Sequence, residues 1–353
     1  MAAGRAAPPR TLRGMSGGAP AGWDDAAARS PGGHVLQSTA WARIRRSQGW
    51  DAEFVRIGDP LPVALVLWRR LPVFGPMAYV PRGPVVAPGD RDGLAHALEA
   101  LAELARERRA VLLKVDPELT PEEAAAQLDH AGYRRGPDIQ PVLATLVIDL
   151  APDLDAVLAG LEKDTRWSVR QSAKRGVVIR EAGDEAALRS FYELYRTTGG
   201  RAGFITRTWE YYALVWRTLI GDGLARLRLA YLGERAVAAA MTWRCGGREL
   251  YMYGASSDEG RRCYASYGLQ WECIAGAKAS GAHTYDLGGI PLDPSRKDDP
   301  MYGPYLFKKG FGGSARAYVG AHDAVPRELA YRSFLAAEPL YTRVLQLLGR
   351  GAR

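Results

Sequence analysis

Hydrophobic positions in the first half of the chain alternate between short apolar runs and one longer stretch with helical spacing. The run 62–70 (PVALVLWRR) predicts a β-strand, and a second strand is expected around 77–80. A helix is predicted from about Asp92, the expected N-cap, because leucines recur after it at helical spacing. The apolar run 110–115 then predicts a strand that ends at Asp116.

The second half of the chain repeats this order of elements. It predicts a hairpin, a third strand, a helix and a returning strand, in order at 224–232, 236–245, 249–253, 265–280 and 283–287. The returning strand carries Asp286, much as Asp116 closes the last strand of the first half. This layout is that of an acyl-CoA N-acyltransferase (GNAT) domain. The sequence therefore predicts an α+β fold with two GNAT-like domains in tandem.

The segment between the two repeats is predicted to be mostly helical. One long helix is expected over 154–174, and further helices over 184–197 and 208–219. The long helix carries cations at spacings of three to four residues, which are Lys163, Arg166, Arg170, Lys174 and Arg175. This basic face has two interpretations, a solvated surface or a binding face for a polyanion.

We divide the chain into a tail, two domains and a final helical segment. The tail is expected to be disordered, because its Ala, Gly, Pro and Arg bury too little apolar surface. The final segment is expected to pack back on the first domain. The bounds of the tail, the two domains and the final segment are 1–33, 34–150, 151–325 and 326–353.

Charge, cysteine content and histidine spacing limit the partners, metals and compartment that we expect for this protein. The net charge of +8 and the pI near 9.4 favour anionic partners such as nucleic acid, phosphorylated precursors or an anionic membrane face. Three cysteines form no C-x-x-C motif, and five histidines show no metal-binding spacing. We therefore expect a cytoplasmic protein without a metal or cofactor.

Several short motifs then occur in a recognisable order along the chain. They are Gln37-Ser38-Thr39-Ala40-Trp41, Tyr79-Val80-Pro81-Arg82-Gly83-Pro84, Lys114-Val115-Asp116-Pro117, Tyr285-Asp286-Leu287-Gly288-Gly289 and Phe307-Lys308-Lys309-Gly310-Phe311-Gly312. Together they resemble the Fem family, the tRNA-dependent aminoacyltransferases that build peptidoglycan interpeptide bridges. The resemblance covers about residues 34–325. It implies two acyltransferase-like domains, in agreement with the internal repeat.

The resemblance also implies an activity and its partners. The expected reaction moves glycine or another small amino acid from aminoacyl-tRNA to an amine of a nucleotide- or lipid-linked muramyl peptide. A lipid-linked acceptor would bring the enzyme to the inner face of the membrane. Members of the family often carry a coiled-coil arm in the second domain. No sustained heptad pattern occurs between residues 184 and 224, so we expect a form without the arm.

Catalytic candidates follow from matching positions in the family motifs. Lys308 is our first choice for the electrostatic role. Its ammonium would stabilise either the negative charge that develops on the reacting ester or the peptide carboxylate that aligns the acceptor, and Phe307 would line the same channel. Asp116 resembles a residue proposed in the family as a general base. An Asp that closes a strand before Pro often only caps a turn, so a structural role stays open for Asp116.

Candidates for binding the precursor come from the same comparison. Arg45 stands four residues after Trp41, where relatives carry a phosphate-binding Lys, and arginine can contact phosphate in bidentate fashion. Arg207 and Tyr211, spaced i and i+4, resemble a second binding pair. Tyr253 is a weaker match.

Three alternatives compete with this interpretation. An acyl-CoA N-acyltransferase is disfavoured because residues 258–265 lack the glycine pair of a pyrophosphate loop. A tRNA-dependent peptide ligase of natural-product biosynthesis would carry the same motifs. A non-enzymatic nucleic-acid-binding protein is disfavoured, because we expect the aromatic residues not to be interleaved with basic ones.

Overall fold

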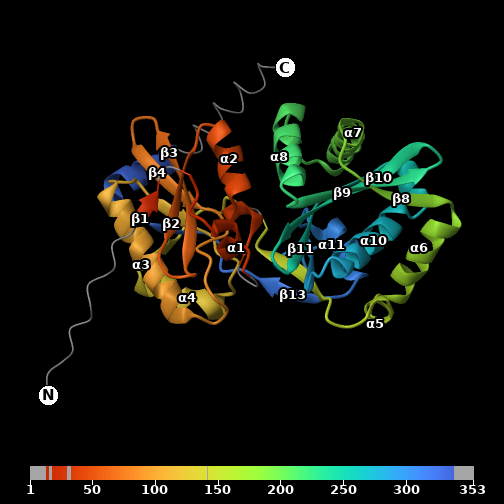
Figure 1. Cartoon of the computed structure of the whole chain (residues 1–353), viewed down its shortest axis with the longest axis horizontal. Coiled ribbons are helices and arrows are strands. Elements are labelled where there is room, and N and C mark those ends of the chain that lie inside the picture. Colours follow the sequence, from red (N-terminus) through yellow and green to blue (C-terminus); the bar gives the residue numbers. More distant parts are fainter. Residues whose placement is uncertain (1–12, 16–17, 30–32, 141, 338–353) are drawn as a thin grey trace.

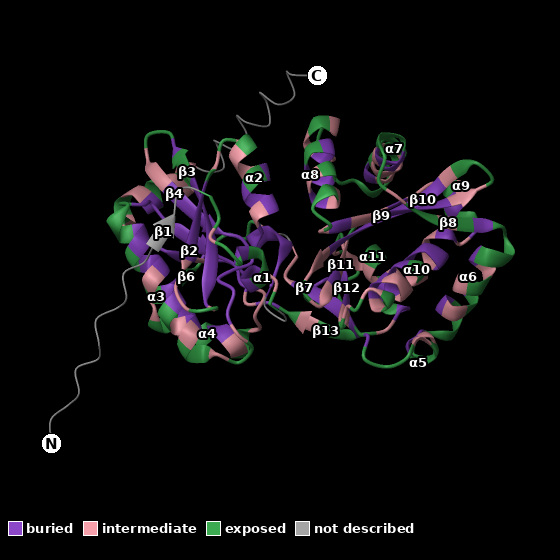
Figure 2. Ribbon diagram, viewed as in Figure 1, coloured by how far each residue is buried: buried purple, intermediate pink, exposed green. Residues whose placement is uncertain are grey.

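The protein is described by a computed structural model that covers residues 13–15, 18–29, 33–140 and 142–337. Two lobes lie side by side, each built around one twisted sheet (Figure 1). The blue C-terminal part of the chain reappears in the lobe formed by the red and orange N-terminal part. Buried residues concentrate in the strands of each lobe and in the inner faces of the helices (Figure 2).

The first sheet has seven strands among the described residues. In sheet order they are β1 (Arg13–Met15), β2 (Asp51–Arg56), β3 (Val63–Leu71), β4 (Gly75–Val80), β5 (Leu113–Val115), β14 (His322–Ala324) and β6 (Arg134–Arg135). Only β4 and β5 run parallel, because the helix between them returns the chain to the same end of the sheet.

The second sheet also has seven described strands. In sheet order they are β13 (Ser314–Ala317), β7 (Ala144–Asp149), β12 (Thr284–Gly289), β11 (Arg248–Ser256), β10 (Arg235–Cys245), β9 (Ala225–Leu232) and β8 (Val177–Ala182). Its parallel pair, β11 with β12, corresponds to β4 with β5 in the first sheet. The predicted tandem GNAT-like fold is therefore confirmed.

The helices cover the two sheets. Those of the first lobe are α1 (Trp23–Ala27), α2 (Thr39–Ser47), α3 (Arg91–Glu107) and α4 (Pro121–His130), with a 3-10 turn at Val35–Gln37. Those of the second lobe are α5 (Leu154–Ala159), α6 (Lys163–Lys174), α7 (Glu185–Ala202), α8 (Trp209–Gly221), α9 (Asp258–Arg262), α10 (Ala265–Ala279) and α11 (Tyr302–Lys309). The N-cap of α3 is Asp90 rather than Asp92, since the Asp90 carboxylate accepts from Gly93 N at 2.8 Å.

A single apolar core joins the two lobes. Trp41 of α2 lies with its ring centroid 6.1 Å from that of Trp243 on β10, and both side chains are buried. Trp216 of α8 belongs to the same cluster of buried residues as Phe54 of β2. The lobes therefore share buried apolar surface, which favours a fixed relative orientation.

The predicted tail differs from the structure where residues are described. Residues 23–27 form α1, and Trp23 is only 1% exposed. Its indole packs edge-on against Phe54 and donates a hydrogen bond to Gln37 O at 2.8 Å. One large aromatic side chain thus anchors a segment whose composition otherwise resembles disorder. Residues 1–12, 16–17 and 30–32 lie outside the described part.

Strand pairing also shifts the predicted domain bounds. The strand 144–149, assigned by us to the first domain, pairs with β12 and β13 in the second sheet. Residues 322–324, assigned to the second domain, pair with β5 and β6 in the first sheet. Residues 328–337 are helical, and Tyr331 packs against Leu112 of the first lobe. Residues 338–353 of the expected final helical segment lie outside the described part.

The long helix predicted over 154–174 is two helices. Gly160 ends α5, and Leu161 is buried before α6 begins at Lys163. Glu162 N donates a hydrogen bond to Gly310 O at 2.9 Å. This bond connects the linker between α5 and α6 to the segment after α11. Where a coiled-coil arm was considered, the described chain has α7 and α8, the longer of which has 18 residues.

Candidate active site

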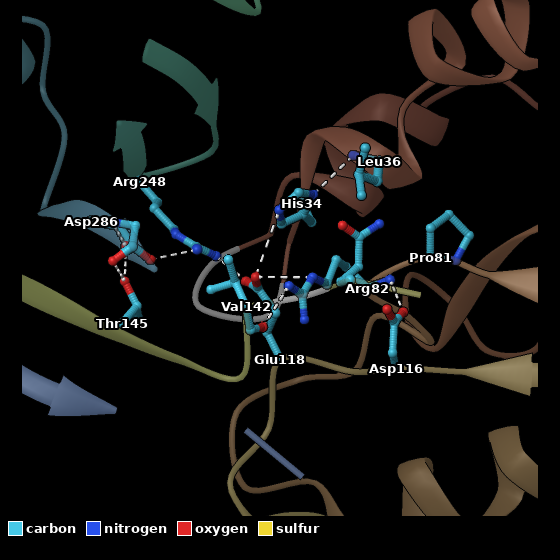
Figure 3. A network of polar contacts seen from close by, with 12 residues as sticks. His34, Leu36, Pro81, Arg82, Asp116, Glu118, Val142, Thr145, Arg248 and Asp286 are labelled. Atoms are coloured by element: carbon cyan, nitrogen blue, oxygen red, sulfur yellow. Dashed lines mark hydrogen bonds and ion pairs between the residues drawn. The ribbon is translucent and has the colours of Figure 1, made fainter. Parts of the chain in front are cut away.

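Asp116 lies at the end of β5, where the loop 81–84 crosses over it. Its side chain is 2% exposed, and both carboxylate oxygens are engaged. Arg82 N donates to Oδ1 at 2.6 Å (Figure 3). Tyr79 Oη donates to Oδ2 at 2.8 Å. Burial raises the pKa of Asp116 to about 6, although the Arg82 charge opposes the shift. These contacts favour a structural role, since they hold the loop in place.

We expect Asp116→Asn to change the pH dependence of stability more than the transfer rate. The folded carboxyl binds protons up to about pH 6 and the unfolded one up to its ordinary pKa of 3.8. Stability of the wild type therefore falls as the pH rises between those values, and the variant loses this trend. Urea unfolding at several pH values, with turnover measured in parallel, checks both statements. A folded Asp116→Asn protein with little turnover would instead make Asp116 the general base.

A buried ionic network connects the end of β5 to the second sheet. Glu118 stands at its centre and contacts Arg82 Nε at 3.4 Å, and it also pairs with Arg248, the first residue of β11 (Figure 3). His34 Nε2 lies 3.7 Å from Glu118 Oε1, and burial lowers the pKa of His34 to about 3. His34 is therefore neutral, and its Nδ1 accepts from Leu36 N at 3.0 Å. The two arginines hold the pKa of Glu118 well below its usual range in spite of burial.

The network continues to the strand that carries the second aspartate. Arg248 Nη2 donates to Asp286 Oδ2 at 2.6 Å. The other oxygen of Asp286 accepts from the hydroxyl of Thr145 and, at 2.7 Å, from Gly288 N. The chain of contacts from Arg82 to Asp286 thus ties the two equivalent strand ends of the repeat together.

Lys308 lies just beyond this network, in the last turn of α11. Its side chain is 7% exposed, and Nζ donates to Gly289 O at 2.6 Å. Burial lowers the pKa of Lys308 to about 8, and the charge of Asp286 opposes that shift. The lysine is therefore predominantly cationic at neutral pH and yet close to losing its proton, which suits a group that responds to charge developing beside it.

The backbone around Lys308 explains the Gly-Gly of the motif. Pairing between β11 and β12 ends at Leu250 and Asp286, although both strands continue. Gly288 has a φ of +72°, and a Cβ there would lie 2.8 Å from Tyr251 O and 3.7 Å from Lys308 Nζ. The positive φ and the short approach to Tyr251 O mean that only glycine fits this position without displacing β11.

The predicted precursor-binding residues meet where α2 faces α8. Arg207 and Arg69 both lower the pKa of Arg45 by charge repulsion, in addition to the larger effect of burial. The guanidinium of Arg207 lies over the ring of Tyr211, 4.6 Å from its centroid. Arg45 Nε and Gln48 Nε2 are buried and lack a hydrogen-bond partner among the described residues. Uncompensated cations with free donors make this cluster a candidate anion site.

Tyr253 is placed differently from the other predicted binding residues. It lies among core aromatics, with its ring edge-on to those of Tyr212 and Trp243 at centroid distances of 5.9 Å. Burial raises the pKa of Tyr253 well above its ordinary value. Phe307 is half-buried, and its ring centroid lies 5.0 Å from that of Tyr267.

Sequence reasoning missed Glu118, Arg248 and Arg69. No spacing in the chain joins Glu118 to Arg248, because their contact depends on how the two lobes meet. Arg69 lies on β3 within a predicted strand, and nothing local distinguishes it from its neighbour Arg70. The described residues hold no cluster of three or more His, Cys, Asp or Glu side chains suited to a metal ion. Within the same part of the chain, every helix is too short or too polar to traverse a bilayer.

Comparison with known proteins adds two matching family models. The model of the FemAB family matches residues 23–132, and that of the acetyltransferase (GNAT) domain matches residues 159–308. A lipid II:glycine glycyltransferase of Staphylococcus aureus (strain USA300) is 26% identical over 394 aligned positions, covering 89% of this chain and 93% of the relative. The aligned positions exceed the 353 residues of this chain, so the relative carries segments that this chain lacks.

Solved structures show the same architecture. A crystal structure of FemX has a TM-score of 0.79 and 24% identity, with 88% of this chain and 96% of that one covered. The C-terminal domain of a putative lysylphosphatidylglycerol synthetase from Agrobacterium fabrum has a TM-score of 0.56 and 14% identity, with coverages of 87% and 94%. At these identities the likeness concerns the fold.

Proposed function

Because this chain belongs to the FemAB family and is a transferase, we propose that it moves an amino acid from aminoacyl-tRNA to an amine of a peptidoglycan precursor peptide. The observation that carries the proposal is the likeness to a lipid II:glycine glycyltransferase along nearly the whole length of both chains. Glycine or another small residue is the proposed cargo.

The proposed reaction is aminolysis of an ester. The precursor amine attacks the carbonyl carbon of the aminoacyl ester, a C–N bond forms, and the C–O bond to the ribose breaks. The amine loses a proton, and the ribose oxygen leaves as a hydroxyl after gaining one. The ester is already activated, so the protein needs to orient two substrates and stabilise the oxyanion, without forming a covalent intermediate.

Lys308 is the proposed electrostatic catalyst. Its buried ammonium is anchored on Gly289 O and lies at the point where β11 and β12 stop pairing. A fixed cation in a site with little water interacts strongly with charge that appears in the transition state. Phe307, one residue earlier on α11, is proposed to line the channel to this position.

The arginine cluster between α2 and α8 is proposed to bind the phosphates of the precursor. We expect Arg45→Met and Arg207→Met each to raise KM for the precursor about tenfold or more with a small effect on kcat, because a hydrogen bond to a charged group contributes about 1.5–3 kcal/mol. Initial rates against precursor concentration give both constants. Arg43→Met is the matched control, since Arg43 lies on the same helix in an exposed ion pair with Asp222.

A precursor without phosphates provides the second control for this assignment. Its KM should be high in the wild type and should not respond to Arg45→Met or Arg207→Met. Equal losses with both precursors would show that the arginines support the fold rather than the phosphates.

The proposed acceptor is lipid-linked, which would bring the protein to the inner face of the membrane, where its net charge of +8 favours attachment. Purified protein would be incubated with aminoacylated tRNA and with either a lipid-linked or a nucleotide-linked muramyl pentapeptide. Mass spectrometry would then determine the masses of the products. We expect an added residue on the lipid-linked precursor. If folded protein modifies neither precursor while a control enzyme does, the acceptor is to be sought among peptide natural products.

The GNAT-domain match favours acyl-CoA as the alternative donor. The segment before α10 argues against it, because Asp258 and Glu259 lie in the short helix α9 where a pyrophosphate would have to approach. Tyr264, the N-cap of α10, has a φ of +60° and places an aromatic side chain there instead of a glycine.

A further inference from the structure

The outward face of α6 presents a tryptophan among cations. Trp167 is 49% exposed, and Lys163, Arg170 and Lys174 follow the spacing that puts them on the same side of the helix. The opposite side is buried through Thr165, Ser168 and Ser172. Our expectation that aromatic and basic residues are not interleaved is wrong for this helix.

The cations on this face are not paired with a carboxylate in the part of the chain that the structure describes, although the exposed Asp164 follows Lys163 in the sequence. Within the described residues, Lys163, Arg170 and Lys174 form no ion pair. Many other exposed arginines form a salt bridge with a carboxylate, as Arg217 does with Glu185. Arg166, at the edge of the face, instead donates to Ala159 O at 2.7 Å. An uncompensated row of cations about one aromatic side chain is suited to a polyanion that also offers planar groups.

A row of aromatic rings leads from this face to the proposed catalyst. The ring of Trp167 is edge-on to Tyr264 with centroids 5.2 Å apart, and Tyr264 is followed by Tyr267 at 6.3 Å. Tyr267 in turn lies 5.0 Å from Phe307, the residue before Lys308. All of these rings but that of Trp167 are half-buried, so the row runs inward from the surface.

We propose that α6 and this aromatic row bind the single-stranded 3′ end of an RNA donor. The cations of α6 contact its phosphates, and Trp167 stacks on a base near the point where the strand turns toward Lys308. Stacking on aromatic side chains accepts any base, and cations along the strand supply affinity that depends on salt. This inference rests on the proposed function and assigns the surface by which the donor enters.

Fluorescence anisotropy with a labelled short single-stranded RNA tests the inference. We expect tighter binding of the single strand than of a blunt duplex of the same sequence, and about tenfold weaker single-strand binding for Trp167→Ala. The combined variant Lys163→Gln, Arg170→Gln, Lys174→Gln should reduce the slope of log K against log salt by about 2, at about 0.7 for each lost cation.

A matched control removes the same number of cations elsewhere. Arg106, Arg134 and Arg332 are exposed and lie on the first lobe or its C-terminal helix. Replacing all three by Gln should leave the affinity for the single strand and its salt slope much closer to those of the wild type. Equal losses in the control and the α6 variant would reduce the effect to net charge and would overturn the assignment.

Two further outcomes separate this inference from the proposed function. If the protein transfers the amino acid and Trp167→Ala leaves KM for aminoacyl-tRNA unchanged, the surface is wrong while the function stands. If the α6 variants lose single-strand binding but no transfer to a muramyl peptide occurs, the surface is right and the acceptor is wrong. Loss of binding to anionic vesicles, with RNA binding intact, would make α6 a membrane contact and would overturn the assignment.

Discussion

Replacing Lys308 by methionine is expected to lower kcat by about 10²–10³-fold, the usual loss when one group that stabilises an oxyanion is removed. Methionine keeps most of the buried stem and removes the charge. Water cannot readily take the place of the ammonium in the variant, because the ammonium is held on Gly289 O and the site is nearly inaccessible to solvent. Single-turnover transfer, with folding checked by circular dichroism, measures the effect. A folded variant with normal turnover would remove Lys308 from the mechanism.

The pH dependence of Lys308 gives an independent check. The folded pKa is about 8 and the ordinary value is 10.5, so activity that needs the ammonium should fall as the pH rises through about 8. The residual activity of Lys308→Met should lack this fall. Between pH 8 and 10.5 the unfolded chain binds more protons than the folded one. The contribution of this side chain to the free energy of unfolding therefore rises with pH in the wild type. Lys308→Met lacks this rise.

Replacing Arg248 by methionine is expected to lower the free energy of unfolding by about 3–5 kcal/mol, since it leaves buried carboxylates without their partner. Arg248 pairs with both Glu118 and Asp286, whose side chains are only 9% and 1% exposed. Urea unfolding measures the change. Arg106→Met is the matched control, because its pair with Glu103 is exposed and such pairs contribute about 0–1 kcal/mol.

The same variant should affect catalysis through the relative placement of the lobes. Glu118 follows β5 of the first sheet and Arg248 begins β11 of the second. We expect Arg248→Lys, which keeps the charge but loses the second donor, to fall between the wild type and Arg248→Met in stability. If Arg248→Met is as stable as the control, the network is not what fixes the lobes.

The repeated strand–helix–strand plan could be predicted because it depends on local patterns. The apolar runs around Val66, Leu113 and Leu229 all became strands. The resemblance to the Fem family, carried by short motifs, is also confirmed. Periodicity and turn chemistry are properties of neighbouring residues, so they can be recognised in the sequence without knowledge of the tertiary fold.

Features that depend on distant contacts could not be predicted. Trp23 orders an otherwise tail-like segment because its indole packs against Phe54 and donates a hydrogen bond to Gln37 O. β14 crosses back to the first sheet, although its sequence neighbours belong to the second. The motif residue Asp116 could be picked from the sequence, but its engagement by Tyr79 and Arg82 required the fold.

The proposed function depends above all on an RNA ester as the source of the amino acid. The most direct test offers the same labelled glycine as glycyl-tRNA and as a glycyl-CoA thioester, each with a lipid-linked muramyl pentapeptide, and measures label in the peptide. We expect transfer from the tRNA alone, and loss of that transfer after ribonuclease treatment. Transfer from the thioester, or transfer that survives ribonuclease, would exclude tRNA as the required donor and place the protein with the acyl-CoA enzymes.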